Sequence, residues 1–195
     1  MMSDAPELII VGGANGSGKS TVALPLSERT GIRYLGADAI AAKLNSENPA
    51  DAAFEAAREF IKTLSRAVNR QESLIVESTL SGLVLRKWLL KAKQNGYYIT
   101  ILFLYVESPE LNIKRIKERV KKGEHFVPTR DVRRRFPRAN FNFWNSYKEL
   151  ADEWILFNNA GKNAEEIASG GESDVIITKR RKYTQWLKMI SKPVK

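Results

Sequence analysis

The sequence contains no cysteine and only one histidine, His125, among its 195 residues. The absence of cysteine excludes disulfide bonds, thiolate metal sites and a cysteine nucleophile. A single histidine excludes any site that needs two imidazole groups from one chain. Chemistry that depends on thiols or on paired imidazoles is therefore excluded.

Long hydrophobic runs are also missing. No run reaches the roughly 18 apolar residues that a membrane-spanning helix needs, and the N-terminal sequence MMSDAPE lacks the basic-then-apolar order of a signal peptide. We therefore expect a cytoplasmic protein without membrane contact. A chain of this length is long enough to bury a core, so we expect a single domain over residues 1–195.

Acidic residues are few relative to basic ones: 22 Asp and Glu stand against 32 Lys and Arg, giving a formal net charge of +10. The excess is concentrated in residues 111–138, with 11 bases and three acids, and in residues 179–195, with seven bases and no acid. Two interpretations remain open at this point. The cations could form a surface for nucleic acid, or they could face a small polyanionic substrate such as a nucleotide.

The segment LIIVGGANGSGKST, residues 8–21, carries the most specific motif in the chain. Four apolar residues predict a buried strand, and residues 13–20 then match the P-loop pattern G-x-x-x-x-G-K-[ST]. The glycines allow successive backbone N–H groups to turn around a phosphate, and the helix that follows points its positive end at the anion. Lys19 would contact the β- and γ-phosphates, and the Ser20 hydroxyl would bind Mg²⁺. The predicted nucleotide-binding residues are Gly13, Ala14, Asn15, Gly16, Ser17, Gly18, Lys19, Ser20 and Thr21.

Predicted strands and helices alternate along the chain. We expect strands at 8–11, 32–35, 73–77, 97–106 and 154–158, and a short strand or an apolar docking segment at 174–178 after a flexible 169–171. Helices are expected at 20–30, 39–44, 49–69, 82–95, 109–123 and 130–152, and a basic helix closes the chain. In the helix at 49–69, the predicted apolar stripe is Phe54, Ala57, Ile61, Leu64 and Val68. This order predicts a three-layer α/β P-loop NTPase fold, with a mostly parallel central sheet and helices on both faces.

Two carboxylates follow predicted strands, at the edge of the sheet where ligands bind. Asp38 follows the second strand, and Glu77 ends the third. Acids near a triphosphate repel it unless they hold a metal ion or handle a proton, and a kinase uses such a group to accept the proton of the acceptor hydroxyl. Other roles remain open: Asp38 could cap the next helix, and Glu77 could bind a Mg²⁺-coordinated water.

The motifs together resemble the zeta toxin family of P-loop phosphotransferases. The resemblance rests on GANGSGKS at 13–20, GADAIA at 36–41, ESTLS at 77–81, and RIKERVKKGEHFVP at 115–128 leading to Arg133 and Arg134. It extends from the first strand to about Asn159. The resemblance implies a Walker A kinase-like α/β domain, and characterised members of the family phosphorylate UDP-N-acetylsugars with ATP and Mg²⁺.

The resemblance also implies roles for individual residues. Lys19 and Ser20 would be the ligands of the triphosphate and the metal ion, and Asp38 would be the base that activates the acceptor hydroxyl. Glu77 and Thr79 would hold the acceptor substrate.

The basic segment at 111–138 corresponds to a lid that closes over the nucleotide. Within it, the resemblance makes Arg119 and Arg134 the residues that clamp the ATP phosphates, and guanidinium groups suit that task. The resemblance does not extend convincingly to His125, which is expected to be a polar loop residue. Residues 158–162 are expected beside the adenine.

From the sequence, we expect an ATP- and Mg²⁺-dependent kinase acting on a hydroxyl of a small acceptor such as a UDP-N-acetylsugar. A toxin role would require a separate antitoxin protein as partner, since no segment of this chain resembles one. Two alternatives stay open. One is a nucleic-acid kinase or NTPase that uses the basic surface, and the other is a nucleotide-binding module without catalytic activity.

Overall fold

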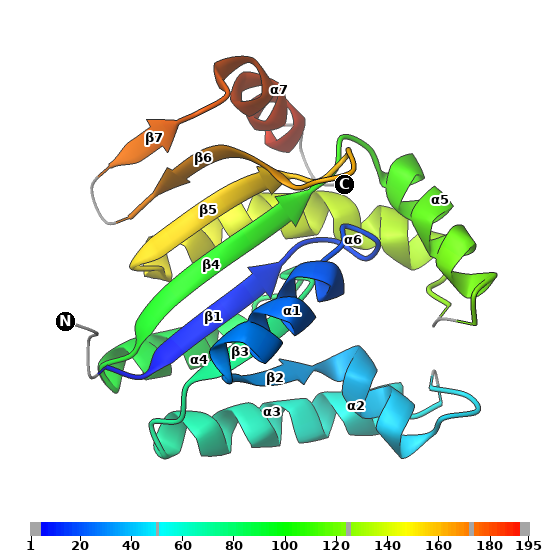
Figure 1. The fold of residues 1–195 in the computed structure, drawn as a ribbon, viewed down its shortest axis with the longest axis vertical. Coiled ribbons are helices and arrows are strands. Elements are labelled where there is room, and N and C mark those ends of the chain that lie inside the picture. Colours follow the sequence, from blue (N-terminus) through cyan, green and yellow to red (C-terminus); the bar gives the residue numbers. More distant parts are fainter. Residues whose placement is uncertain (1–4, 50, 124–125, 172–173, 192–195) are drawn as a thin grey trace.

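A computed structural model describes residues 5–49, 51–123, 126–171 and 174–191. His125 lies outside the described residues. The described chain forms a seven-stranded sheet in the order β2-β3-β1-β4-β5-β6-β7 (Figure 1). Its strands are β1 (Glu7–Gly12), β2 (Arg33–Gly36), β3 (Leu74–Ser78), β4 (Tyr98–Tyr105), β5 (Glu153–Asn158), β6 (Glu165–Gly170) and β7 (Val175–Ile177).

The first five strands are parallel, and β6 and β7 join them in antiparallel orientation. Strand β1 lies between β3 and β4, and its residues Leu8, Ile10 and Val11 are fully buried. A parallel strand covered on both faces has a nearly continuous apolar sequence, as this one has. The P-loop therefore starts from the central, most buried part of the sheet.

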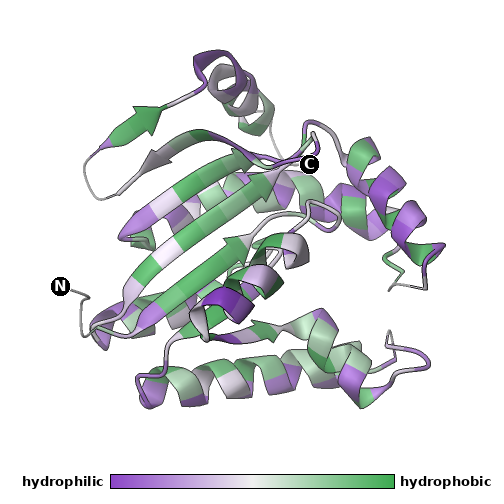
Figure 2. Ribbon diagram, in the orientation of Figure 1, coloured by the Kyte–Doolittle hydropathy of each residue, from purple (hydrophilic) through white to green (hydrophobic). Residues whose placement is uncertain are grey.

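Helices cover both faces of the sheet, as the predicted three-layer fold requires. They are α1 (Ser20–Thr30), α2 (Ala37–Leu44), α3 (Ala53–Asn69), α4 (Val84–Gln94), α5 (Pro109–Val120), α6 (Thr129–Asn142) and α7 (Arg180–Ile190). Helix α1 packs on one face, where Ala23 contacts the cluster of Val11, Ile75 and Leu104. The larger core lies on the other face, where α4 and α6 are seen behind the sheet (Figure 1). Figure 2 shows that the central strands are mostly hydrophobic and that α5 carries many hydrophilic residues.

Aromatic side chains fill the larger core near β4 and β5. Phe103 stacks on Phe143 with ring centroids 4.2 Å apart, and Trp154 and Trp186 are each 1% exposed. The indole N–H of Trp186 donates a hydrogen bond of 3.0 Å to Asn140 Oδ1, which satisfies its buried polar atom. Trp186 therefore anchors the basic helix α7 to the core.

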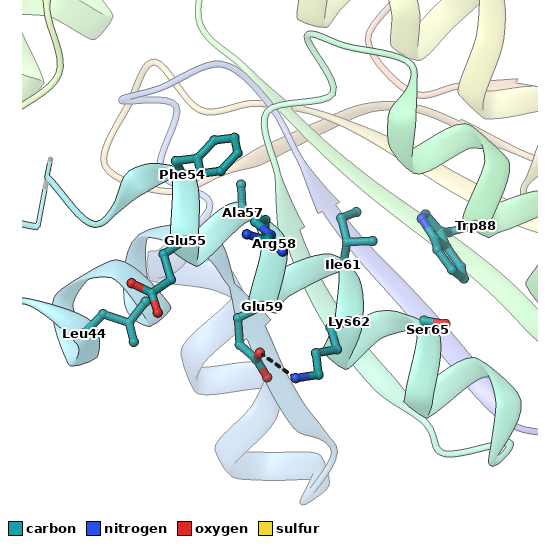
Figure 3. A pocket seen from close by; sticks show the side chains of 10 residues that line it. All are labelled: Leu44, Phe54, Glu55, Ala57, Arg58, Glu59, Ile61, Lys62, Ser65 and Trp88. Carbon is teal, nitrogen blue, oxygen red and sulfur yellow. Dashed lines mark ion pairs between the residues drawn. The ribbon is translucent and has the colours of Figure 1, made fainter.

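The predicted apolar stripe of the third helix is wrong in its first turns. Helix α3 begins at Ala53, and its buried residues are Ala56, Leu64, Ala67 and Val68, whereas Phe54 is 77% exposed. Phe54 and Ile61 instead line a hollow of about 820 Å³ on the outer side of α3, next to Trp88 of α4 (Figure 3). In these turns small alanines face the core in place of the large apolar residues. The buried face of α3 therefore differs from the predicted one.

Two other segments differ from expectation. The helix expected over 130–152 changes after α6 into a π-helical turn η1 (Phe143–Tyr147) and a 3₁₀ turn η2 (Lys148–Leu150). The segment at 169–171, expected to be flexible, contains the last residues of β6, which pairs with both β5 and β7. Among the described residues, none of the helices has the length and apolar character needed to cross a membrane.

Candidate functional site

The P-loop connects β1 to α1 and has the backbone geometry of an anion cradle. Gly13, Gly16 and Gly18 have φ values of +143°, +79° and +92°, a region that favours glycine. A Cβ atom on Gly16 would lie 2.7 Å from the backbone oxygen of Asn112, and one on Gly18 would overlap the side-chain amide of Asn159. Both the backbone conformation and the close packing therefore require glycine, so the loop fits a phosphate.

Lys19 lies at the end of this loop, and it is only 7% exposed. Its ammonium nitrogen is 3.3 Å from the backbone oxygen of Ala14 and 3.6 Å from Glu77 Oε1. Helix α1 begins at the next residue, Ser20, and the Thr21 hydroxyl donates a 2.6 Å hydrogen bond to the backbone oxygen of Gly18. The charge, the hydroxyl and the helix start that phosphate binding needs are thus supplied by consecutive residues.

An open cleft of about 920 Å³ lies beside the P-loop at the carboxyl ends of the strands. One wall is formed by the P-loop and the start of α1, with Gly16, Gly18, Ser20 and Thr21, and further along α1 by Leu24, Pro25 and Glu28. The other walls are formed by Tyr34, Asp38, Ala39, Arg115, Arg119, Asn159, Gly161 and Lys162. A smaller cavity of about 70 Å³ joins it and is lined by Asn15, Gly16, Lys19, Ser20, Asp38, Ile116, Arg119 and Val127. The hollow on α3 contains none of these residues, so we place the site in the cleft.

Asp38 lines both the cleft and the small cavity. Helix α2 begins at Ala37, so Asp38 lies in its first turn, and Gly36 occupies the N-cap position. In the part of the chain that the structure describes, no hydrogen bond or ion pair engages the Asp38 carboxylate. The N-cap role considered for Asp38 is therefore not the one it has here, and its carboxylate faces the site.

Glu77, at the end of β3, is connected to the P-loop through Lys19 and to β2 through Tyr34. The Tyr34 hydroxyl donates a 2.8 Å hydrogen bond to Glu77 Oε2. Burial, and then the charge and hydrogen bond of Glu77, raise the pKa of Tyr34 far above its usual value, so the hydroxyl stays protonated. Thr79 lies two residues further, and its hydroxyl is 2.9 Å from that of Ser81. Neither Glu77 nor Thr79 lines the described cleft.

The arginines of α5 and α6 differ in their positions. Arg119 lines both cavities, and Arg115 donates a 3.2 Å hydrogen bond to the backbone oxygen of Ala160. Arg134 is exposed and forms a 2.9 Å ion pair with Asp131. The cation of α6 that reaches the P-loop is Arg135, whose guanidinium lies 3.3 Å from Asn15 Oδ1.

The sequence contained the signal that distinguishes these two arginines. Val132, Phe136 and Ala139 form the buried stripe of α6. At about 100° per residue, Arg135 lies beside this stripe and Arg134 on the opposite side of the helix. The assignment of Arg134 to the phosphates stays a prediction, and Arg135 is the residue that the sequence analysis missed.

The segment after β5 closes the cleft on the side of the P-loop. The side-chain amide of Asn159 donates a 2.8 Å hydrogen bond to the backbone oxygen of Ser17, and Asn159, Gly161 and Lys162 line the cleft. This segment is therefore joined to the phosphate loop, as a wall around a nucleotide would need. Its contact with adenine stays a prediction.

Comparison with known structures shows the same fold in several proteins. A chain from the PezAT chromosomal toxin–antitoxin system of Streptococcus pneumoniae superimposes with a TM-score of 0.66 at 14% identity, over 98% of this chain and 88% of that one. The AvrRxo1-ORF1:-ORF2 structure with ATP gives a TM-score of 0.72 at 18% identity, over 95% of this chain and 64% of that one. A chain of the Pnkp1/Rnl/Hen1 RNA repair complex gives 0.58 at 19% identity, over 72% of this chain and 46% of that one. At these identities, the likeness shows a shared fold.

Sequence comparison shows the family. An uncharacterised protein of Haemophilus influenzae is 36% identical over 124 residues, which make up 64% of this chain and 88% of that protein. Residues 8–141, from the first strand to the end of α6, match the AAA_33 family, described as an AAA domain. The chain therefore belongs to the AAA_33 family of P-loop domains.

Proposed function

We propose that the protein is an ATP- and Mg²⁺-dependent phosphotransferase, similar to zeta toxins, that phosphorylates a hydroxyl of a small acceptor. The observation that supports this most directly is the position of Asp38. Its carboxylate shares a small cavity with Lys19, Ser20 and Arg119, and no cation among the described residues pairs with it. A carboxylate placed beside a phosphate site without a cation partner suits proton transfer better than it suits structural support.

In this proposal each residue has a task that its position permits. The P-loop N–H groups and Lys19 bind the β- and γ-phosphates, and Arg119 neutralises charge on the γ-phosphoryl group from the α5 side. Asp38 accepts the proton of the acceptor hydroxyl while the hydroxyl oxygen attacks the γ-phosphorus and ADP leaves. Residues 111–138 would form the lid, and Arg135 would join the phosphate contacts because it already touches the P-loop.

We propose one protein ligand for the metal ion. The Ser20 hydroxyl, at the first position of α1, would hold Mg²⁺, which would neutralise charge on the phosphates when bound. In the described residues, no group of three or more carboxylates or imidazoles could hold a metal ion without the nucleotide. The residues present thus fit a Mg²⁺ ion that arrives with ATP.

The acceptor would bind beside Asp38 and reach Glu77 and Thr79, which do not line the described cleft. A UDP-N-acetylsugar is the acceptor class that the resemblance to zeta toxins suggests, and the antitoxin named with the PezAT relative suggests a protein partner of that kind. The basic charge of α5 and α6 would serve the phosphates of both substrates. Part of it is already paired within the chain, since Arg133 and Arg134 contact Glu110 and Asp131.

The experiment is phosphate transfer from γ-labelled ATP with Mg²⁺ into UDP-N-acetylsugars, simple metabolites and 5′-hydroxyl oligonucleotides. We expect label in a small acceptor, a loss of about 100-fold or more in Asp38→Asn with ATP affinity within about threefold, and no change in Asp174→Asn. Asp174 is an exposed acid beside β7 and provides the matched control. Equal loss of ATP binding and transfer in Asp38→Asn would contradict the assignment of the base.

Two other results would redirect the proposal. Label that enters only the oligonucleotides, with binding that weakens steeply as salt is raised, would indicate a nucleic-acid kinase. Slow release of free phosphate that is equal in the wild type and Asp38→Asn would indicate that Asp38 is structural, and the phosphotransferase proposal would then be rejected.

A further inference from the structure

The Tyr34 side chain lies across a position that only glycine can occupy. Gly36 is opposite Glu77 in the β2–β3 register, and Tyr34 is two residues earlier on the same face of β2. A Cβ atom on Gly36 would overlap the Tyr34 hydroxyl oxygen and would lie 2.7 Å from its ring carbon Cζ. The tyrosine ring therefore passes over Gly36 to reach the neighbouring strand, and its hydroxyl meets the Glu77 carboxylate there.

This contact divides the Glu77 carboxylate between two partners. Oε2 accepts the hydrogen bond from Tyr34 at 2.8 Å, and Oε1 faces the Lys19 ammonium at 3.6 Å. The side chains of Lys19 and Glu77 are 7% and 9% exposed, so water screens their attraction only weakly. The lysine that must bind phosphate is thus held by the carboxylate that is expected to bind the acceptor.

We propose that Tyr34 is a positioning residue that fixes Glu77, so that one carboxylate oxygen holds Lys19 before nucleotide binds and is released to the acceptor afterwards. The part of this inference that concerns nucleotide binding rests only on the contacts among Tyr34, Glu77 and Lys19. The acceptor half rests on the proposed function, because it assumes that Glu77 contacts the acceptor.

The exchange follows from charge. When the triphosphate binds, Lys19 turns from one carboxylate to several phosphate oxygens, and the Glu77 charge would then repel the nucleotide unless something else stabilises it. The Tyr34 hydroxyl is that group, since burial and the nearby acids raise its pKa and keep it a donor. Without the hydroxyl, Glu77 would hold Lys19 more strongly and repel phosphate more strongly. ATP affinity should therefore depend on Tyr34 only while Glu77 is charged.

The test is a double-mutant cycle on Mg-ATP affinity, measured by titration calorimetry without acceptor for the wild type, Tyr34→Phe, Glu77→Gln and the double variant. We expect Tyr34→Phe to weaken Mg-ATP binding about fivefold and Glu77→Gln to strengthen it. In the Glu77→Gln background, Tyr34→Phe should change affinity less than about twofold. Tyr98→Phe, at a tyrosine on the opposite end of the sheet that is 43% exposed, is the matched control and should change nothing.

Gly36→Ala provides a second perturbation of the same contact. The added methyl group displaces the Tyr34 ring, so this variant should weaken Mg-ATP binding as Tyr34→Phe does, and Glu77→Gln should again remove the effect. Effects of Tyr34→Phe that are equal in both backgrounds, or absent from both, would overturn the inference. Because the cycle uses no acceptor, its failure is distinguishable from failure of the phosphotransferase proposal, which the Asp38→Asn transfer assay tests.

Discussion

Two glycines with positive φ values allow the P-loop geometry to be tested quantitatively. Gly18 and Gly31 have φ values of +92° and +71°, so alanine is strained at both positions. A Cβ atom on Gly31 has no heavy atom within 4 Å, whereas one on Gly18 would overlap the side-chain amide of Asn159. Gly31→Ala therefore measures the backbone strain alone, and Gly18→Ala measures the strain together with the close approach.

The expected magnitudes follow from these contacts. Left-handed backbone costs alanine about 1–2 kcal/mol, and the smaller freedom of the unfolded chain offsets about 0.4–1 kcal/mol of it. Gly31→Ala should therefore lower the free energy of unfolding by about 1 kcal/mol. Gly18→Ala also moves Asn159 away from the backbone oxygen of Ser17, which costs about 1 kcal/mol more for the lost hydrogen bond. The total for Gly18→Ala is about 2 kcal/mol.

Urea unfolding followed by tryptophan fluorescence gives both free energies of unfolding, provided that the slope of this free energy against urea concentration is the same in the variants and the wild type. Calorimetric titration with Mg-ATP then separates stability from function. Gly18→Ala should weaken ATP binding at least about tenfold, because the displaced loop no longer directs its N–H groups at one point, and Gly31→Ala should leave it within about twofold. Equal ATP affinities in the two variants would refute the placement of the phosphate cradle.

Two further predictions concern single side chains. Arg135→Gln should weaken Mg-ATP binding about fivefold and Arg134→Gln less than about twofold. The reason is that Arg135 contacts Asn15 of the P-loop, whereas Arg134 pairs with Asp131. The reverse order of effects in the same titration would favour Arg134 as the phosphate ligand. Tyr97→Phe should lower the free energy of unfolding in urea by about 1–2 kcal/mol, since its hydroxyl lies 2.9 Å from the backbone oxygens of Ala67, in the last turn of α3, and of Glu72, which follows that helix. No change would show that these oxygens are satisfied without the hydroxyl.

The sequence was sufficient to predict the parallel half of the sheet. Strands β1, β3, β4 and β5 are apolar runs that end in glycine, polar or acidic residues, and such runs are typical of strands buried between two helical layers. The P-loop could be recognised because its glycines, lysine and serine are fixed by local backbone geometry. Local rules of this kind do not depend on how distant segments pack.

Strand β6 could not be predicted because its sequence, EEIASG, has weak strand propensity and ends in residues typical of turns. It becomes a strand through pairing with β5, where Gly170 is opposite Trp154. A Cβ atom on Gly170 would lie 2.8 Å from the Trp154 ring, so this glycine is required by close approach rather than by a turn. The tertiary environment, which the sequence pattern does not show, decides the structure here.

The site shows the same division between local and long-range information. The motifs placed Lys19, Asp38 and Glu77 near one edge of the sheet, and parallel topology alone brings such positions together. The contacts between residues of the site were harder to predict. Tyr34 falls within an expected strand without any signal of its contact with Glu77, and the sequence analysis does not distinguish Arg135 from its neighbours. The Tyr34 contact follows from strand register, which needs the packed structure, whereas the position of Arg135 follows from the phase of the apolar stripe of α6, which the sequence already contained.

Asp38 and Glu77 illustrate why such partners matter for function. Both are acids near the same phosphate cradle, but Glu77 is paired with Lys19 and Tyr34, whereas no described residue pairs with Asp38. A carboxylate whose two oxygens already contact partners in the protein is less free to approach an acceptor hydroxyl. A carboxylate that faces a cavity without such partners is free to approach an acceptor hydroxyl. This difference in pairing supports the proposal that Asp38 is the base and that Glu77 binds the acceptor, although both acids follow strands at the same edge of the sheet.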